Sequence, residues 1–460
     1  MRRLSALCLV ICLPLMALAE TAVPQSLPQV QLSFAPVVKA AAPAVVNIYA
    51  TRIVQDRSSP FSGDPFFDQF FRDLGPVTPR VQNSLGSGVI VGADGIVVSN
   101  YHVVEQATDI RVVLTDRREY PAKVLLADQS VDLAVLQLQG ATGLPALPLQ
   151  DSDALQVGDL VLAIGNPFGV GQTVSSGIVS GLARSTLSVG DGRGYFIQTD
   201  APINPGNSGG ALVDMNGALI GINTAILTKG GGSNGIGFAI PSNLVSVVLK
   251  QARDGATRFQ KPWAGVSGQE VDAAMAEAMD MPLPHGVVLT TLHSLSPFTA
   301  AGMKPGDVVI RLGAFDTNTP QEMMFRLNTL GVGATIPVSF LRGGQETTTT
   351  LTLAPPPDDP PRQETAITQD VALRGATLLR INPAVIAEYD LPADAKGVLV
   401  AKAEDIAASV GLAPGDLVQA INGVAVQTPG EALAVLNQGG RRWVLDIQRQ
   451  GQMLRLRFRL

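Results

Sequence analysis

The chain has 460 residues, too many for one core of roughly 100–200 residues, so we expect about three domains. Apolar residues make up 46% and charged residues 16%, which excludes a disordered chain and a coiled coil. The 33 basic and 39 acidic residues give a formal net charge of −6, so nucleic acid is not an expected partner. With 47 glycines and many β-branched residues, the composition predicts a mainly β protein.

The first 19 residues have the pattern of a cleavable secretory signal. Two arginines precede an apolar run over residues 4–18, and Ala17 and Ala19 provide a small-residue cleavage site. The alternative is a membrane anchor, but the run is shorter than the roughly 20 residues that a span needs. Both cysteines, Cys8 and Cys12, lie in this run, so cleavage would leave no thiol. We therefore expect an exported, periplasmic protein with no integral membrane span.

Residues 41 to about 227 consist of short apolar runs separated by turn signals. Asp94-Gly95 lies between residues 89–91 and 96–98, which is the signature of a hairpin with a type I′ turn. Further runs occur at residues 45–49, 110–114, 133–138, 160–164, 195–199, 211–213 and 219–222. About a dozen strands with no helix between them predict antiparallel barrels or a sandwich. A first helix is expected to begin at Pro241-Ser242 and close this domain.

An aromatic segment interrupts this region between residues 55 and 82. Phe66, Phe67, Phe70 and Phe71 fall within six positions of a Pro-, Ser- and Gly-rich stretch. One interpretation is a loop folded onto its own domain. The other is a loop that docks on a neighbouring subunit or gates a site.

The C-terminal half contains an internal repeat. Residues 302–309 match residues 411–418, and residues 285–289 match residues 396–400, so two related modules follow one another. Residues 354–361 between them contain five prolines, which predicts a semi-rigid spacer.

Three residues of the first domain could form a catalytic set. His102, one of three histidines, follows an apolar strand, and Asp132 begins another strand, where burial would require a hydrogen-bond donor. Ser208 lies among glycines that allow a tight turn, and this turn could direct the N–H groups of Gly206 and Ser208 to one point. Taken alone, each feature has a structural alternative, a core histidine or a glycine-rich turn with an incidental serine.

The serine segment also fits the Gly-x-Ser-x-Gly nucleophile elbow of α/β-hydrolases. That fold requires the order serine, acid, histidine among alternating strands and helices. Here the order is His102, Asp132, Ser208 within a strand-only region, as in chymotrypsin-like proteases.

Four motifs together make the chain resemble bacterial HtrA (Deg) serine proteases over about residues 38–460. The motifs are residues 99–104, 132–136, 198–210 and 235–241. The resemblance implies a mainly β fold, with a chymotrypsin-like double six-stranded β-barrel protease domain followed by two PDZ domains. The implied division is a signal peptide at 1–19, the protease domain at 20–260, PDZ domain 1 at 261–354, a Pro-rich linker at 355–370 and PDZ domain 2 at 371–460.

The same resemblance implies an ATP-independent serine endopeptidase that degrades unfolded or misfolded periplasmic proteins. His102 would be the base, Asp132 its orienting acid and Ser208 the nucleophile, with an oxyanion hole at Gly206, Asn207 and Ser208. Residues 227–238 would border the S1 pocket. No metal-ligand cluster or phosphate loop is present, so no cofactor is expected.

Two segments resemble the carboxylate-binding loops of PDZ domains. The first is Trp263, Ala264, Gly265 and Val266, where the tryptophan would narrow the pocket for the side chain of a bound C-terminal peptide. The second, residues 373–376, has Ala376 where a larger apolar residue is common, so either peptide binding or assembly is its role.

Regulation and assembly are further implications of the resemblance. Residues 166–171, 185–194 and 228–235 resemble regulatory loops, although ordinary surface turns have the same composition. Relatives form homotrimers and sometimes larger cages, for which the four phenylalanines are candidate contacts. The competing functions are a holdase chaperone with secondary proteolysis, and a PDZ scaffold with an inactive protease fold.

Overall fold

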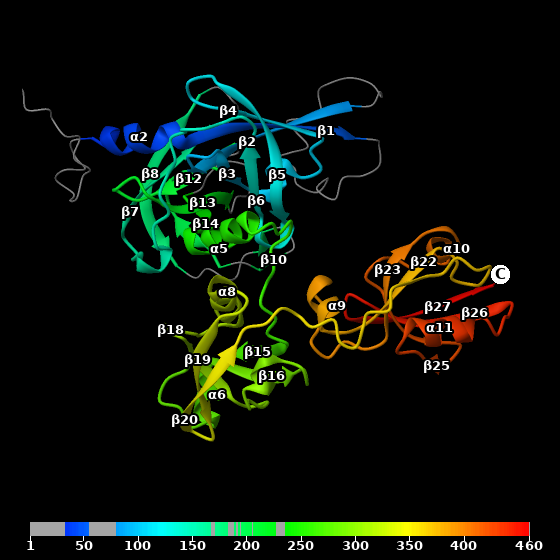
Figure 1. Cartoon of the computed structure of the whole chain (residues 1–460). Coiled ribbons are helices and arrows are strands. Elements are labelled where there is room, and N and C mark those ends of the chain that lie inside the picture. Colours follow the sequence, from blue (N-terminus) through cyan, green and yellow to red (C-terminus); the bar gives the residue numbers. More distant parts are fainter. Residues whose placement is uncertain are drawn as a thin grey trace, which may run out of the picture.

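The computed structural model describes residues 33–54, 80–166, 171–182, 188–189, 192–193, 195–204, 206–226 and 235–459. Figure 1 shows three bodies in chain order: a unit of two barrels, a first module below it, and a second module to its side. The expected signal sequence and the phenylalanine-rich segment lie outside the described residues.

The first barrel is a closed sheet with the strand order β1-β2-β3-β6-β5-β4. Its strands are β1 (Val45–Val54), β2 (Arg80–Gly92), β3 (Ile96–Ser99), β4 (Asp109–Val113), β5 (Glu119–Asp128) and β6 (Leu133–Leu138). Helix α2 (Ala35–Ala41) and the 3₁₀ turn η1 (Ala42–Ala44) precede it, while α4 (Tyr101–Val104) and η2 (Gln129–Val131) interrupt it.

The second barrel is also closed, with the order β11-β14-β13-β12-β7-β8. Its strands are β7 (Leu160–Gly165), β8 (Thr173–Gly181), β11 (Ile197–Thr199), β12 (Ala211–Val213), β13 (Leu219–Ile226) and β14 (Gly237–Pro241). The 3₁₀ turn η3 (Ser152–Ala154) precedes it, and β9 (Ser188–Val189) and β10 (Gly192–Arg193) pair separately. The predicted double six-stranded barrel is therefore confirmed.

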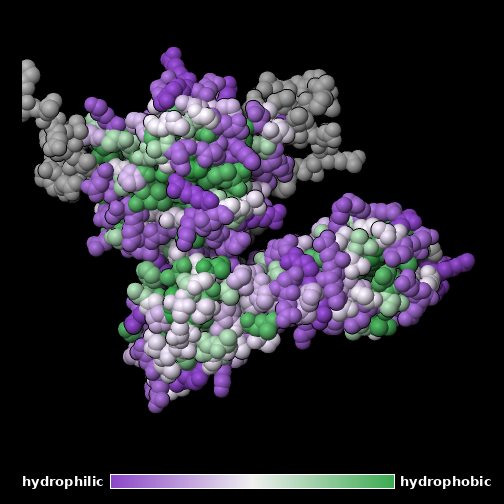
Figure 2. Space-filling model, viewed as in Figure 1, coloured by the Kyte–Doolittle hydropathy of each residue, from purple (hydrophilic) through white to green (hydrophobic). Residues whose placement is uncertain are grey.

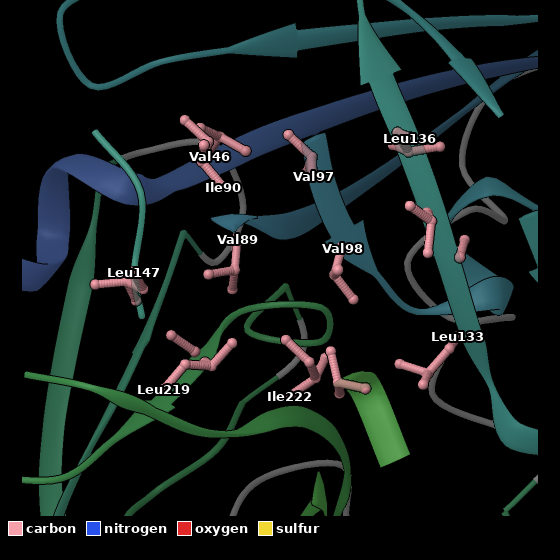
Figure 3. Packing of buried hydrophobic residues seen from close by; sticks show 14 of the residues in the cluster. Val46, Val89, Ile90, Val97, Val98, Leu133, Leu136, Leu147, Leu219 and Ile222 are labelled. Atoms are coloured by element: carbon pink, nitrogen blue, oxygen red, sulfur yellow. The ribbon is translucent and has the colours of Figure 1, made fainter. Parts of the chain in front are cut away.

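One buried cluster joins the two barrels. Val46, Val89 and Val98 of the first barrel belong to the same cluster as Leu219 and Ile222 of the second, and Figure 3 shows these side chains between the strands of both barrels. Burial of this apolar surface fixes the barrels against each other, so that residues at their seam keep defined positions.

The predicted hairpin and helix are present, with one correction. The β2–β3 turn comprises residues 93–95, and of these only Gly95 has a positive φ, +87°. A type I′ turn needs two positive φ values, so the prediction of that turn type was wrong. The register shift between Ile90 and Gly92 instead fits a three-residue loop with a bulge. Helix α5 (Ser242–Arg253) begins where predicted and buries Leu244, Val245 and Val248.

The first module is a sheet with the order β15-β16-β17-β19-β20, and β18 pairs with β17. Its strands are β15 (Val266–Glu270), β16 (Val287–Leu292), β17 (Val308–Leu312), β18 (Phe315–Asp316), β19 (Thr335–Arg342) and β20 (Gln345–Thr352). Its helices are α6 (Ala273–Ala278), α7 (Pro297–Ala300) and α8 (Pro320–Leu330).

The second module repeats this plan with the order β21-β22-β23-β24-β26-β27, and β25 pairs with β24. Its strands are β21 (Thr365–Ala366), β22 (Ala376–Arg380), β23 (Val398–Ala403), β24 (Leu417–Ile421), β25 (Val424–Ala425), β26 (Arg442–Arg449) and β27 (Gln452–Arg459). Its helices are α9 (Pro383–Glu388), α10 (Asp405–Ser409) and α11 (Pro429–Leu436).

An ion pair between a buried aspartate and a partly exposed arginine explains the repeated Gly-Asp motif of the two modules. Asp307 accepts hydrogen bonds from Nε and Nη2 of Arg342 at 2.7 and 2.6 Å. In the second module Asp416 accepts from the same two atoms of Arg449 at 2.6 and 2.7 Å. Both carboxylates are almost completely buried, so each requires its arginine.

Helix α8 of the first module contacts the two-barrel unit. Phe325 belongs to the buried cluster of the barrels, and its ring stacks on Tyr195 with centroids 4.0 Å apart. Figure 2 shows apolar residues gathered over this helix, on the side of the module nearest the barrels. Two bodies that are separate in the sequence are therefore in direct contact.

Candidate active site

The first candidate residue, His102, lies at the rim of the first barrel. All four residues of β3 are buried, and the chain turns at Asn100 into the short helix α4, which carries His102. Val103 and Val104 are buried and anchor this helix. The histidine is thus fixed at the end of a strand that is rigidly held in the core.

Asp132 lies beside it because β3 and β6 are neighbours. Ser99 pairs with Ala134, so the end of β3 and the start of β6 coincide. Asp132 adopts the left-handed conformation with φ of 51° as the chain leaves η2 for β6. The side-chain amide of Asn100 donates to the backbone carbonyl of Asp132 at 2.9 Å, which links the two strand ends.

The carboxylate of Asp132 fixes the orientation of the imidazole. His102 Nδ1 lies 2.9 Å from both Oδ1 and Oδ2, and the His102 backbone N–H donates to Oδ1 at 3.1 Å. An ionised carboxylate only accepts hydrogen bonds, so Nδ1 carries the proton and Nε2 is left as the acceptor. Burial by itself would lower the pKa of His102, but the charge of Asp132 and its hydrogen bond, with a contribution from Glu105, raise it above the usual value.

Ser208 lies at the seam between the two barrels. Its carbonyl accepts from the N–H of Ser87 on β2 at 2.9 Å, and the next amide, of Gly209, donates to the carbonyl of Asn223 on β13 at 2.8 Å. Gly209 has φ of +81°, and a Cβ there would lie 2.1 Å from the carbonyl oxygen of Ser87. Only glycine fits this position, which holds the serine loop between the barrels.

Two backbone amides beside Ser208 are available to an oxyanion. Within the described part of the chain, neither the N–H of Gly206 nor that of Ser208 has a hydrogen-bond acceptor. The N–H of Asn207 donates to the carbonyl of Asn204 at 2.9 Å, so this amide is engaged elsewhere. The side-chain Oδ1 of Asn207 accepts a hydrogen bond from the hydroxyl of Thr173. Neither of these hydrogen bonds supports the expectation that Asn207 contributes to the oxyanion hole.

A residue that the sequence analysis missed, Thr224, links the acid and the serine. Its hydroxyl donates to Asp132 Oδ2 at 2.6 Å, and its carbonyl accepts from Ser208 Oγ at 3.2 Å. Thr224 is 4% exposed and lies at a bulge in β13, where the register with β14 shifts between Asn223 and Ala225. The only sequence signal was a pair of polar residues within an otherwise apolar strand.

The serine hydroxyl is bonded to a backbone carbonyl in this structure. Among the described residues, Ser208 Oγ has its hydrogen bond to the carbonyl of Thr224 and none to His102. Oγ must leave this carbonyl before it can donate to the imidazole. Such loosened geometry is common in proteases without bound substrate.

The other two histidines lie in the first module. His293 packs edge-on against Trp263 with ring centroids 5.2 Å apart, and its Nδ1 accepts from the N–H of Leu295. His285 is paired with the carbonyl of Leu283. Within the described residues no group of three or more His, Cys, Asp or Glu side chains is placed to hold a metal ion.

The second candidate site is the loop that leads into β15. Trp263 is 7% exposed and its ring covers Gly265, which has φ of +60°. The N–H groups of Ala264 and Gly265 have no acceptor among the described residues, and Val266 starts the edge strand β15. Two unpaired amides next to an open strand edge form a suitable receptor for a peptide carboxylate.

Some expected elements fall outside the described residues. These include most of the loops at 166–171, 185–194 and 228–235, and most of the S1 border at 227–238. None of the described helices is long and apolar enough to cross a membrane.

Comparison with known proteins agrees with this fold. A family model described as a trypsin-like peptidase domain matches residues 86–222. The periplasmic serine endoprotease DegP of Salmonella typhimurium is 37% identical over 465 residues, covering 94% of this chain and 92% of that protein. The periplasmic pH-dependent serine endoprotease DegQ of Escherichia coli is 42% identical over 68% of each chain.

A solved structure of the HtrA-type protease AlgW with a decapeptide has a TM-score of 0.52 and 41% identity, covering 71% of this chain and 100% of that one. The double barrel and its matching family model define a trypsin-like serine peptidase, here followed by two PDZ-like modules. This chain belongs to the HtrA family of serine endoproteases.

Proposed function

We propose that the chain cleaves unfolded or misfolded proteins of the periplasm by means of Ser208, His102 and Asp132. The observation that carries this proposal is the chain of hydrogen bonds at the barrel seam, in which His102 is bonded to Asp132 and Thr224 is bonded to both Asp132 and Ser208. Relatives named periplasmic serine endoproteases support the compartment and the reaction. The first 19 residues are proposed to be the export signal.

The reaction begins when Ser208 Oγ turns to His102 and attacks the carbonyl carbon of a peptide bond. Nε2 of His102 takes the hydroxyl proton as the Oγ–C bond forms, and the negative charge develops on the substrate oxygen. The N–H groups of Gly206 and Ser208 are the proposed donors to that oxygen. Asp132 keeps its charge and stabilises the imidazolium.

The tetrahedral intermediate collapses when the C–N bond breaks. His102 gives its proton to the leaving amine, which departs and leaves an acyl ester on Ser208. A water molecule then loses a proton to His102 and attacks the ester carbon. When Oγ leaves, it recovers that proton, so the enzyme returns to its starting state.

The chain is proposed to divide into a signal at 1–19, a protease domain at 20–260, PDZ domains at 261–354 and 371–460, and a linker at 355–370. The first PDZ domain recruits the C-termini of protein substrates through the loop of Trp263, Ala264, Gly265 and Val266, because its strand edge and amides are open. Assembly as a homotrimer, or as a larger cage, belongs to the same proposal.

The test is cleavage of an unfolded polypeptide by the wild type, by Ser208→Ala and by the control Ser409→Ala. Ser409 is an exposed serine of α10 in the second module, far in sequence from the site. We expect Ser208→Ala to lower kcat by about a million-fold and Ser409→Ala to leave it unchanged. Cleavage that survives Ser208→Ala would reject the assigned nucleophile, and aggregation suppression without any cleavage by the wild type would favour a chaperone.

A further inference from the structure

The two modules differ at the strand edge where a peptide would add. In the first module β15 pairs with β16, and its other edge has no partner strand in the described chain. In the second module the equivalent strand β22 pairs with β23 on one side and with β21 on the other. The edge that is open in one module is therefore occupied in the other, by residues of this chain.

The occupying segment, residues 362–367, follows the whole length of β22. The N–H of Arg380 donates to the carbonyl of Arg362 at 2.6 Å at one end. Thr365 and Ala366 then pair with Leu378 and Thr377. The pairing is antiparallel, the direction in which a strand-adding peptide can continue an antiparallel sheet.

Ile367 occupies the place of a ligand's last residue. Its N–H donates to the carbonyl of Ala376 at 2.8 Å, and its own carbonyl accepts from the N–H of Gly375 at 2.9 Å. Gly375 is the counterpart of Gly265 in the first carboxylate-binding loop. The Ile367 side chain is 2% exposed and belongs to the cluster that contains Ala432 and Val435 of α11. A bound C-terminus would place an apolar side chain in the module and an oxygen atom on a loop amide. Ile367 supplies both.

The remaining loop amides of the second module are also engaged. The N–H of Arg374 donates to the carbonyl of Val371, and that of Ala376 to the carbonyl of Leu373, both at 3.0 Å. The Arg374 side chain adds ion pairs to Asp370 and Asp405 that hold the turn. In the first module the matching amides of Ala264 and Gly265 are unpaired within the described residues.

We propose that residues 362–367 are an internal strand ligand of the second module, with Ile367 in place of a terminal residue. A C-terminal peptide then has one site per chain, at β15 of the first module. The inference rests on the proposed recruitment of C-termini, because the statement of one peptide site per chain assumes that the first module binds a C-terminal peptide. The self-occupied module is left to structural roles such as assembly.

The test is amide-resolved hydrogen exchange on the full chain carrying Ser208→Ala, which prevents self-cleavage. Without peptide, we expect the amides of Gly375 and Ile367 to exchange slowly and the amide of Gly265 to exchange fast. A peptide ending in an apolar residue should protect residues 264–270 and leave residues 362–380 unchanged, and calorimetry should give one peptide per chain. Fast exchange at Gly375, new protection at 373–380, or two peptides per chain would overturn the inference.

A pair of substitutions tests whether residues 362–367 act as a bound strand or as part of the module's core. Ile367→Ala should speed exchange at Gly375 while β24 and β26 stay protected. The control Ile421→Ala removes an equally buried isoleucine from the same cluster and should raise exchange across all strands of the module together. If Ile367→Ala behaves like the control, the segment is ordinary core and the inference fails. If no peptide binds at all, the recruitment proposal fails. The difference in exchange rate between the amides of Gly375 and Gly265 still tests whether residues 362–367 occupy the second module.

Discussion

Thr224 is a positioning residue for the proposed triad, because it contacts Asp132 and Ser208 but takes no part in the reaction itself. Its hydroxyl is one of the donors that hold the buried carboxylate of Asp132. Thr224→Val removes this hydrogen bond at nearly constant volume, and the loss of a bond to a charged group costs about 1.5–3 kcal/mol. We expect kcat/KM to fall by roughly 10- to 100-fold, as measured on an unfolded substrate.

The matched control keeps the hydroxyl. Thr224→Ser should retain most of the activity, because only a methyl group is lost and Oγ can still reach Asp132. Equal losses in the two variants would show that packing around the methyl group matters and that the hydrogen bond does not.

The charge state of His102 sets the acid limit of activity. Only the neutral imidazole accepts the serine proton, and Asp132 raises the pKa of His102 despite its burial. The imidazole therefore remains protonated to a higher pH than a free histidine, and kcat/KM should fall as the pH drops through a midpoint above 6.5.

The measurement is the pH profile of kcat/KM, together with NMR titration of the His102 ring in Ser208→Ala. Asp132→Asn removes the negative charge that raises the pKa, so the ring midpoint should move down in that variant. A wild-type ring midpoint at or below 6.5 would contradict this prediction.

Among the structural elements, the serine loop shows how the two barrels combine into one site. Gly209 has a positive φ and also lies against Ser87, with no space for a Cβ. Gly209→Ala should therefore abolish cleavage and destabilise the protease domain by more than the approximately 1–2 kcal/mol of left-handed strain alone. Thermal unfolding and cleavage assays measure the two effects.

Gly140→Ala is the matched control for backbone strain. Gly140 has φ of +72°, and a Cβ there would meet nothing within 4 Å. This variant should show only the strain cost and keep full activity. If both variants lose the same stability and remain active, the close contact with Ser87 is not important.

The sequence was informative for elements with strong apolar patterns. The runs of β3, β6, β7 and β12 were recognised because nearly every residue in them is buried. Strand β8 was missed because most of its residues are exposed or half-buried and several are polar, so that its sequence resembles a loop. The helix signal at Pro241-Ser242 was confirmed because a buried face repeats at helical spacing.

The candidate site was predictable only in part, for a similar reason. His102, Asp132 and Ser208 were found from local motifs and their chain order. Thr224 was not, because its position depends on a bulge that no local residue pattern specifies. Likewise, the pairing of residues 362–367 with β22 arises from tertiary packing, whereas their proline-rich surroundings indicated a spacer.

At the scale of the whole molecule, Arg326 forms an ion pair between the first module and the barrels. Arg326 of α8 is 7% exposed, lies 4.1 Å from the centroid of the Phe315 ring, and donates to Asp153 at 2.5 Å. Asp153 belongs to η3 of the two-barrel unit. This ion pair and the stacked rings of Tyr195 and Phe325 hold the module in place.

Arg326→Ala should release the first module from the barrels. Removing one partner of a buried ion pair costs about 3 kcal/mol or more, because Asp153 would lose its counter-charge in a partly buried position. We expect faster hydrogen exchange in α8 and around Tyr195, and faster proteolysis of the connection at residues 254–262. The control Arg311→Ala breaks an exposed pair with Asp316 on the same module, which is worth less than about 1 kcal/mol. If α8 exchanges equally in both variants, the contact between the bodies does not depend on Arg326, and the apolar stacking of Phe325 alone must hold them together.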